Sequence, residues 1–258
     1  MLPLLLALTA VAGDPAAGAK LAGLAGCAAC HTAEDGAPYA GGYAIVTDFG
    51  TFYGSNLTPD PDTGIGAWSE ADFVRAMRHG RSPEGKAYWP AFPYPSFTQI
   101  DDDDLGDLWA YLQTLEPVVQ EVAPSDVSRS RFELSLWRRL AFRRGGRAYE
   151  VESGEHALGA YLTNAVGHCG ECHTPRSGIG IPRKKQVYSG TDAPPEPAPP
   201  ITSEALGWSI AELSSFLEDG WTPDDDVVGG EMARIVREGT AKLTDEERRA
   251  MAAYILSR

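Results

Sequence analysis

The chain has 258 residues, of which 43% are hydrophobic, so it can bury sizeable cores. At roughly 100 to 150 residues per domain, two domains are expected rather than one. The formal net charge is −14, with 36 acidic against 22 basic residues, which argues against a nucleic-acid partner because phosphate binding requires a basic surface.

The start of the sequence predicts a secretory signal at residues 1–12. Residues 2–12 form an apolar run that ends in Ala10-Val11-Ala12, the small-residue pattern typical of a signal cleavage site. This run is too short to cross a hydrocarbon core, which needs about 20 residues. An apolar first helix retained in the mature protein is the alternative. The signal predicts an exported bacterial protein of the periplasm.

All four cysteines fall within two short motifs of the same form. The motifs are Cys27-Ala-Ala-Cys30-His31 and Cys169-Gly-Glu-Cys172-His173. Cys-x-x-Cys-His is the attachment pattern of haem c, because two thiols one helical turn apart reach the two vinyl groups while the adjacent imidazole meets the iron. The motifs therefore predict two haem c groups, haem 1 and haem 2, with both histidines as iron ligands. A thiol redox pair or a zinc site is the competing interpretation.

A helix is expected before each motif. Asp14 can cap a helix that has Pro15 at its first position and that delivers Cys27 at its end. Residues 153–164 are expected to do the same for Cys169. Because haem replaces much of the side-chain core, the predicted fold class is all-α: two tandem cytochrome c domains, each a few short helices and loops.

An internal repeat supports two similar domains. Residues 68–80 align without a gap with residues 208–220, and both segments read as Ser-capped amphipathic helices that end at glycine. The last helix of the second copy has a capping box at residues 244–247. The predicted organisation is a signal peptide at 1–12, a first cytochrome c domain at 14–117, a basic aromatic linker at 118–149 and a second domain at 150–258.

The repeat also predicts that the two irons have different sixth ligands. Met232 stands twelve residues after Gly220, at a loop position from which its thioether could reach the iron opposite His173. Phe92 stands twelve residues after Gly80, and phenylalanine cannot ligate iron. We therefore expect His/Met ligation at haem 2 and a different arrangement at haem 1.

The sixth ligand of haem 1 stays open at this point. Met77 aligns with Leu217 and lies on the apolar face of its helix, which favours core packing. His79 precedes the helix-ending Gly80, where a cation interacts favourably with the helix dipole. An iron with no sixth protein ligand is the third possibility.

The segment from Pro117 to Gly146 is basic and aromatic in an otherwise acidic chain. Its arginines are interleaved with large apolar residues: Arg129, Arg131, Arg138, Arg139, Arg143 and Arg144 with Phe132, Leu134, Leu136, Trp137, Leu140 and Phe142. Two functional interpretations are a docking surface for an acidic redox partner and a peripheral membrane contact through residues 129–147. The structural alternative is a linker that packs its apolar residues between the domains while its arginines pair with haem propionates or with the acids at 101–104. The proline-rich run at 194–200 predicts a stiff surface loop bordering haem 2.

Two stretches of the first half carry a family resemblance. Residues 56–69 read NLTPDPDTGIGAWS and residues 88–97 read YWPAFPYPSF. The chain resembles the cytochrome c subunits of periplasmic alcohol, gluconate and aldehyde dehydrogenases over nearly all of its mature sequence. The resemblance implies a carrier of electrons from a catalytic partner towards a quinone or a terminal oxidase. That family usually has three haem domains, and it has methionine where this chain has Phe92.

The predicted function is electron transfer by a dihaem cytochrome c rather than enzyme catalysis. The expected partners are redox proteins, with a periplasmic dehydrogenase as donor and a cytochrome or a quinone-linked or oxidase acceptor. Because methionine ligation raises the reduction potential, electrons are expected to pass from haem 1 to haem 2. The alternative is a peroxidase-like or thiosulfate-oxidising haem enzyme that uses an open iron at haem 1, although no acid/base pair accompanies Phe92.

Overall fold

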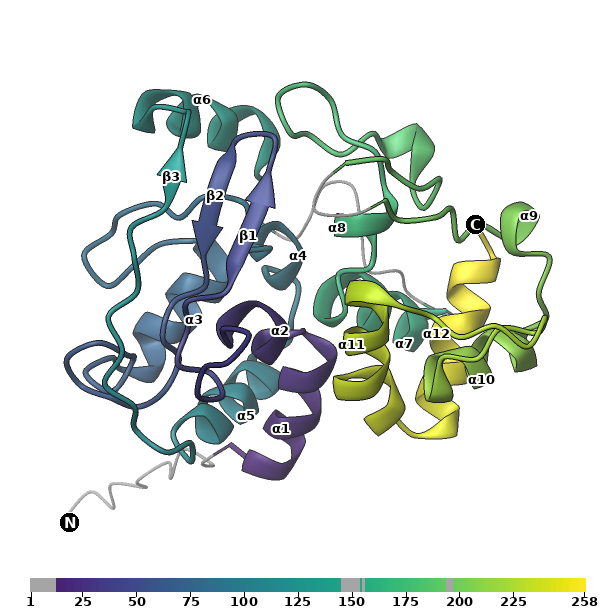
Figure 1. Ribbon diagram of the computed structural model, residues 1–258, viewed down its shortest axis with the longest axis horizontal. Coiled ribbons are helices and arrows are strands. Elements are labelled where there is room, and N and C mark those ends of the chain that lie inside the picture. The colour runs from purple at the N-terminus through teal and green to yellow at the C-terminus, as the bar shows by residue number, and fades with distance from the viewer. Residues whose placement is uncertain (1–12, 145–153, 155, 194–196) are drawn as a thin grey trace, which may run out of the picture.

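The computed structural model of the chain describes residues 13–144, 154, 156–193 and 197–258. Two groups of helices lie side by side (Figure 1). We call the group from residues 13–117 the first repeat and the group from residues 154–258 the second repeat. The predicted signal at 1–12 and the end of the predicted linker at 145–149 lie outside the described residues.

The first repeat is built on two crossing helices, α1 (Pro15–Leu24) and α5 (Asp102–Leu112). Asp14 caps α1 as predicted, because its carboxylate accepts a hydrogen bond from the Ala16 amide at 2.8 Å. The crossing is close at Gly18, where an added Cβ would stand 2.0 Å from the carbonyl oxygen of Asp107. The other helices are α2 (Cys27–His31), α3 (Glu70–His79) and α4 (Tyr94–Phe97).

The first repeat also contains a small antiparallel sheet, so the prediction of an all-α fold was wrong in this part. β1 (Ala44–Thr47) pairs with β2 (Gly50–Tyr53), and β2 pairs with β3 (Asp126–Val127). Isoleucine, valine, threonine and aromatic residues in β1 and β2 favour extended backbone. Within the described part of the chain no strand exceeds four residues, and β3 comes from the predicted linker, so the sequence pattern near β1 and β2 was too short to reveal the sheet.

The described part of the predicted linker lies against the first repeat. It forms α6 (Arg131–Ala141), which starts with a capping box between Ser130 and Glu133. Leu134 is buried on the inner face of α6. Three large apolar residues are exposed on the outer face: Phe132, Leu136 and Leu140. The expectation that the linker packs its apolar residues between the domains is therefore wrong for these three.

The second repeat follows the same plan. α7 (Ala157–Ala160) crosses α12 (Asp245–Leu256), again at a glycine: a Cβ on Gly159 would stand 2.0 Å from the carbonyl oxygen of Ala250. α7 continues into a π-helical segment, η1 (Tyr161–Val166). The remaining elements are α8 (Gly170–His173), η2 (Lys184–Gln186), α9 (Ser203–Leu206), α10 (Ile210–Asp219), α11 (Gly230–Glu238) and η3 (Thr240–Lys242).

The helix ends predicted from the internal repeat are confirmed. Ser69 and Ser209 form capping boxes at the starts of α3 and α10. Gly80 and Gly220 end these helices in the left-handed conformation, with φ of 55° and 78°. The capping box predicted at residues 244–247 starts α12.

One continuous set of buried apolar side chains joins the two repeats. It includes Leu21 and Leu24 of α1 together with Leu162 and Val166 of η1. α1 and α11 lie next to each other where the repeats meet (Figure 1). Among the described residues, no helix is both long enough and apolar enough to cross a membrane. The shared core places the two Cys-x-x-Cys-His motifs in a fixed relation.

Candidate functional site

The first Cys-x-x-Cys-His motif forms α2, which follows α1 after a sharp turn at Gly26. The side chain of His31 ends this helix, with Nδ1 at 2.7 Å from the carbonyl oxygen of Ser55. A carbonyl oxygen only accepts hydrogen bonds, so Nδ1 donates and Nε2 carries the lone pair that a metal could bind. Burial lowers the pKa of His31, which favours the neutral imidazole that metal ligation requires.

The second motif repeats this arrangement. His173 ends α8, and its Nδ1 lies 2.8 Å from the carbonyl oxygen of Pro199. Burial lowers the pKa of His173 as well. Pro199 belongs to the proline-rich run at 194–200, whose described part therefore borders the second motif. Both histidines thus present Nε2 as the ligating atom.

The loops that follow the two motifs match bond by bond. The Oγ1 atom of Thr32 accepts from the Tyr39 amide, and that of Thr174 accepts from the Tyr188 amide, both at 3.0 Å. Tyr39 and Tyr188 have φ values of 61° and 63°, a region that large side chains rarely occupy. Strain repeated at equivalent positions indicates that both loops are held in one shape for the same purpose.

None of the four cysteines forms a disulfide. Burial raises the pKa of Cys27 and of Cys169 to about 12. The pKa of Cys30 rises to about 11 because of burial and of the neighbouring Cys172. Burial therefore favours the protonated thiol at these three positions. The described residues contain no group of three or more Cys, His, Asp or Glu side chains placed to hold a metal ion.

The residues of both motifs fit haem c. Each motif offers two thiols, which can add S–H across a vinyl C=C bond without releasing any atom, and one imidazole whose Nε2 lone pair can bind a metal. One haem would be held by Cys27, Cys30 and His31, and the other by Cys169, Cys172 and His173. When bound, haem supplies an iron centre that takes up and releases one electron.

Met232 lies in the first turn of α11 and not in a loop, so that part of the prediction was wrong. The helix begins at Gly230, where the Ala233 amide bonds the carbonyl oxygen of Gly229 at 3.3 Å. Met232 is half-buried and packs against the same core as Cys169. Its role as the ligand opposite His173 stays a prediction.

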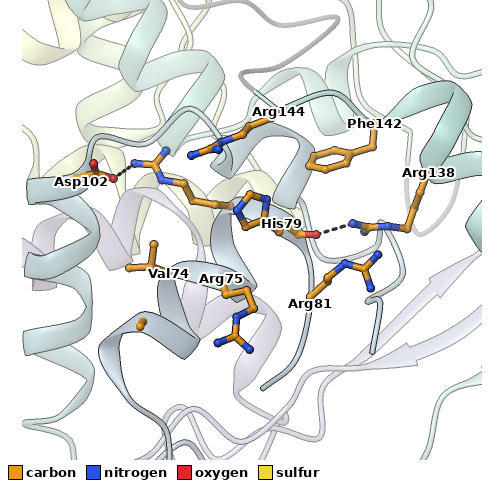
Figure 2. Close-up of a pocket in the computed structure, with 10 residues that line it drawn as sticks. Val74, Arg75, His79, Arg81, Asp102, Arg138, Phe142 and Arg144 are labelled. Carbon is orange, nitrogen blue, oxygen red and sulfur yellow. Dashed lines mark hydrogen bonds and ion pairs between the residues drawn. The ribbon is translucent and has the colours of Figure 1, made fainter. Parts of the chain in front are cut away.

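The three residues considered for haem 1 lie in different surroundings. Phe92 packs against the core among other aromatic rings, and Met77 is a buried core residue of α3. His79 lines a basic pocket of about 570 Å³ between α3 and α6 (Figure 2). Burial, followed by the charge of Arg144 and other arginines, lowers the pKa of His79.

The two motifs meet where the repeats join. His168, directly before Cys169, bonds the carbonyl oxygen of Ala25, two residues before Cys27, at 3.2 Å. Beside them, the Ser96 hydroxyl donates a hydrogen bond to Glu171, which lies between the two cysteines of the second motif, at 3.1 Å. The helices that carry the two motifs are therefore neighbours.

His168 strengthens this junction from the second repeat. It directly precedes Cys169, and its Nε2 donates to the carbonyl oxygen of Ala25 at 3.2 Å. Its ring also packs edge-on against Phe97, with 5.3 Å between ring centroids. Two further bonds cross nearby, from Arg234 to the Ala29 carbonyl at 3.1 Å and from the Tyr43 hydroxyl to Glu231 at 2.6 Å.

Sequence reasoning missed the residues that position the histidines. Ser55 and Pro199 act through backbone carbonyl oxygens, which no residue type marks. A signal did exist next to Ser55, in the NLTPD stretch. The buried Asn56 accepts from the Thr58 amide at 2.9 Å and donates to the carbonyl oxygen of Val118 at 2.8 Å, which fixes the loop that presents Ser55.

Comparisons with known proteins agree with this geometry. The model of the family described as Cytochrome c matches residues 15–116 and again residues 157–258. A "Diheme cytochrome c-type" protein of Cereibacter sphaeroides is 42% identical over 256 residues, covering 94% of this chain and 85% of the relative. The cytochrome c subunit of a quinone alcohol dehydrogenase of Gluconobacter oxydans is 37% identical, covering 93% of this chain and 54% of the relative. The cytochrome c subunit of a gluconate 2-dehydrogenase of Pantoea cypripedii is 36% identical, covering 93% and 58%. The chain therefore spans little more than half the length of these two dehydrogenase subunits.

Proposed function

Because the chain belongs to the cytochrome c family and carries two haem c groups, we propose that it relays electrons in the periplasm from a dehydrogenase, through haem 1 and haem 2, to a downstream acceptor. Its relatives are named as cytochromes or as cytochrome subunits of dehydrogenases, which supports an electron carrier rather than a catalytic subunit. These relatives give no support to the alternative of a haem enzyme.

The observation that carries the proposal is the junction of α2 and α8. Haems held by the cysteines of the two motifs would lie near each other, because His168 beside the second motif bonds Ala25 beside the first at 3.2 Å. Electron tunnelling slows exponentially with distance, and a shared core keeps this distance short and constant. The arrangement favours direct exchange of electrons between the two haems.

The proposed direction follows from the expected ligands. A methionine thioether opposite His173 raises the potential of haem 2, which makes haem 2 the exit. An anaerobic potentiometric titration of the purified protein, followed by visible spectra, tests this direction. Two one-electron steps are expected, with Met232→His lowering the higher potential and leaving the lower one in place. A wild-type haem 2 below haem 1 would contradict the direction.

The proposed compartment and donor rest on the N-terminal pattern and on the names of the relatives. Expression of the full chain in a bacterium that makes cytochromes c should give a periplasmic protein whose N-terminus starts just after Ala12. Its intact mass should exceed that of the processed chain by two haems. Recovery of the unprocessed chain in the cytoplasm, or of a mass with fewer haems, would contradict the proposal.

The proposed membrane contact is the outer face of α6. Phe132, Leu136 and Leu140 recur every four residues, so they form one exposed stripe along the helix. The exposed Arg139 and Arg143 accompany this stripe. Bulky apolar side chains flanked by arginines are typical of helices that lie on an anionic bilayer surface. The acidic remainder of the chain would be repelled by the same surface, which orients the molecule.

Flotation with vesicles tests the membrane contact. The protein should float with vesicles that contain anionic lipid, less so at high salt, and not with purely zwitterionic vesicles. The triple change of Phe132, Leu136 and Leu140 to serine should abolish flotation. Val119→Ser is the control, because Val119 is also an exposed large apolar residue but lies outside α6. Unchanged flotation of the triple variant would rule out α6 as the contact.

A further inference from the structure

The segments that follow α3 and α10 form the same backbone hydrogen bonds, so the residues after the two helices can be aligned one to one. The Tyr88 amide bonds the Gly80 carbonyl at 2.8 Å, and the Val228 amide bonds the Gly220 carbonyl at 3.0 Å. Inside each loop a second backbone bond recurs: the Ser82 amide bonds the Lys86 carbonyl at 2.9 Å, and the Thr222 amide bonds the Asp226 carbonyl at 2.8 Å. Four residues beyond each loop stand Phe92 and Met232. Phe92 and Met232 therefore stand at the same position relative to these loops, although Met232 lies in the first turn of α11 and Phe92 lies two residues before α4.

Phe92 occupies this position within an aromatic cluster. Its ring centroid lies 5.8 Å from that of Tyr88, 5.7 Å from that of Phe97 and 6.2 Å from that of Tyr94. A phenyl ring has no lone pair to give to iron. Burial raises the pKa of both tyrosines to about 12, which disfavours their phenolate forms. Tyr94 is turned towards α6, because its ring packs edge-on against Phe142 and lies 4.9 Å from the Arg138 guanidinium. The Phe92 ring itself offers only apolar surface.

His79 is directed away from the core of the first repeat. Residues two apart on a helix point to nearly opposite sides, and Met77 is on the buried side. His79 instead lies in the basic pocket with Arg75 and Arg144, where the Arg138 guanidinium donates to the His79 carbonyl at 2.5 Å (Figure 2). Bringing His79 to the core would require turning α3 about its axis.

Met77 is placed as a packing residue. It is 5% exposed and shares its helix face with Phe73, four residues earlier. Its equivalent in the second repeat is Leu217, which is 4% exposed and belongs to the same type of core. Because leucine cannot ligate iron, the Leu217 position serves packing in the second repeat. We assign the same packing role to Met77 in the first repeat.

We propose that the iron of haem 1 has no protein ligand opposite His31, and that Phe92 with its aromatic neighbours borders a site for a small uncharged ligand of ferrous iron. This inference rests on the proposed function, since it requires haem bound at the first motif. An apolar border favours neutral diatomic ligands such as carbon monoxide over anions, because burying an unpaired charge among aromatic rings is costly.

Carbon monoxide titration of the reduced holoprotein tests the site, together with EPR of the oxidised form. One carbon monoxide should bind per two haems, and a high-spin ferric signal should account for one haem. Phe92→Met should abolish carbon monoxide binding, remove the high-spin signal and add a second sulfur-to-iron absorption band. Met77→Leu and His79→Gln serve as controls and should bind carbon monoxide like the wild type.

Two results would overturn the inference. The first is a wild type with two low-spin haems and no carbon monoxide binding. The second is carbon monoxide binding that appears only in Met77→Leu or His79→Gln, which would identify that residue as the sixth ligand. A failure of the proposed relay looks different, because one haem would then be missing by mass or would not be reversibly reduced in the potentiometric titration.

Discussion

Single residues decide how closely the helices of each repeat approach. Gly18 and Gly159 stand at equivalent crossings, and in both a Cβ would lie 2.0 Å from a backbone carbonyl oxygen of the facing helix. The sequence indicates the candidate haem-attachment residues, because Cys-x-x-Cys-His is a local pattern of five residues. It does not mark these glycines, because nothing local distinguishes a glycine at a helix crossing from one on the surface.

Gly18→Ala and Gly159→Ala are each expected to lower the free energy of unfolding by roughly 1–3 kcal/mol, because the added methyl meets backbone that cannot rotate away. Gly178→Ala is the control, since an added Cβ there has no atom within 4 Å. Chemical denaturation of the holoproteins measures the three values. Equal stability of all three variants would contradict the close crossing.

At the scale of elements, helix ends were predictable and strands were not. The caps at Asp14, Ser69, Ser209 and Thr244 are confirmed, because a cap is a local signal of one or two side chains. β1 and β2 pair with each other but are only four residues long, and β3 lies more than seventy residues further along the chain, so no local pattern revealed the sheet. α6 was not predicted although Ser130 and Glu133 form a capping box, because its large apolar residues lie on both the inner and the outer face and give no single apolar stripe.

Ser69→Ala and Ser209→Ala should each cost about 1 kcal/mol of unfolding free energy, since each removes the side-chain acceptor at the start of a helix. Ser215→Ala, at an exposed position inside α10, should be neutral or slightly stabilising because alanine is the better helix former. Thermal unfolding of the three variants provides the comparison. A loss at Ser215 equal to that at Ser209 would contradict the capping role.

At the scale of the whole molecule, the two repeats behave as one body. The internal repeat predicted two similar units, but it did not predict that His168, beside the second motif, would contact Ala25, beside the first. That relation is created by contacts between residues far apart in the chain, such as the ion pair between Lys20 of α1 and Glu247 of α12 at 2.6 Å. Partners at this separation leave no periodic or local pattern.

Glu247 should make the junction between the repeats sensitive to acid. Burial acts to raise its pKa, but hydrogen bonds from Lys20 and from Thr244 outweigh it, so the pKa is lowered in the folded state. A lowered carboxyl pKa stabilises the fold above the unfolded value of about 4.3, and this stabilisation is lost as the pH falls through the folded pKa.

Glu247→Gln tests this linkage, because glutamine keeps the capping box but removes the charge. The variant should melt at a lower temperature than the wild type near neutral pH, and the difference should shrink below a pH of about 4. Glu246→Gln is the control at an exposed neighbouring position. A difference that stays constant with pH would contradict the role of the ion pair.

The most direct test of the relay is to inject one electron per molecule into the oxidised protein by pulse radiolysis and to follow both haems by their visible spectra. The account predicts a fast phase whose rate does not depend on protein concentration, in which one haem is reoxidised as the other is reduced. A single redistribution phase that scales with protein concentration would mean that electrons pass only between molecules, and would contradict a relay built on the junction of α2 and α8.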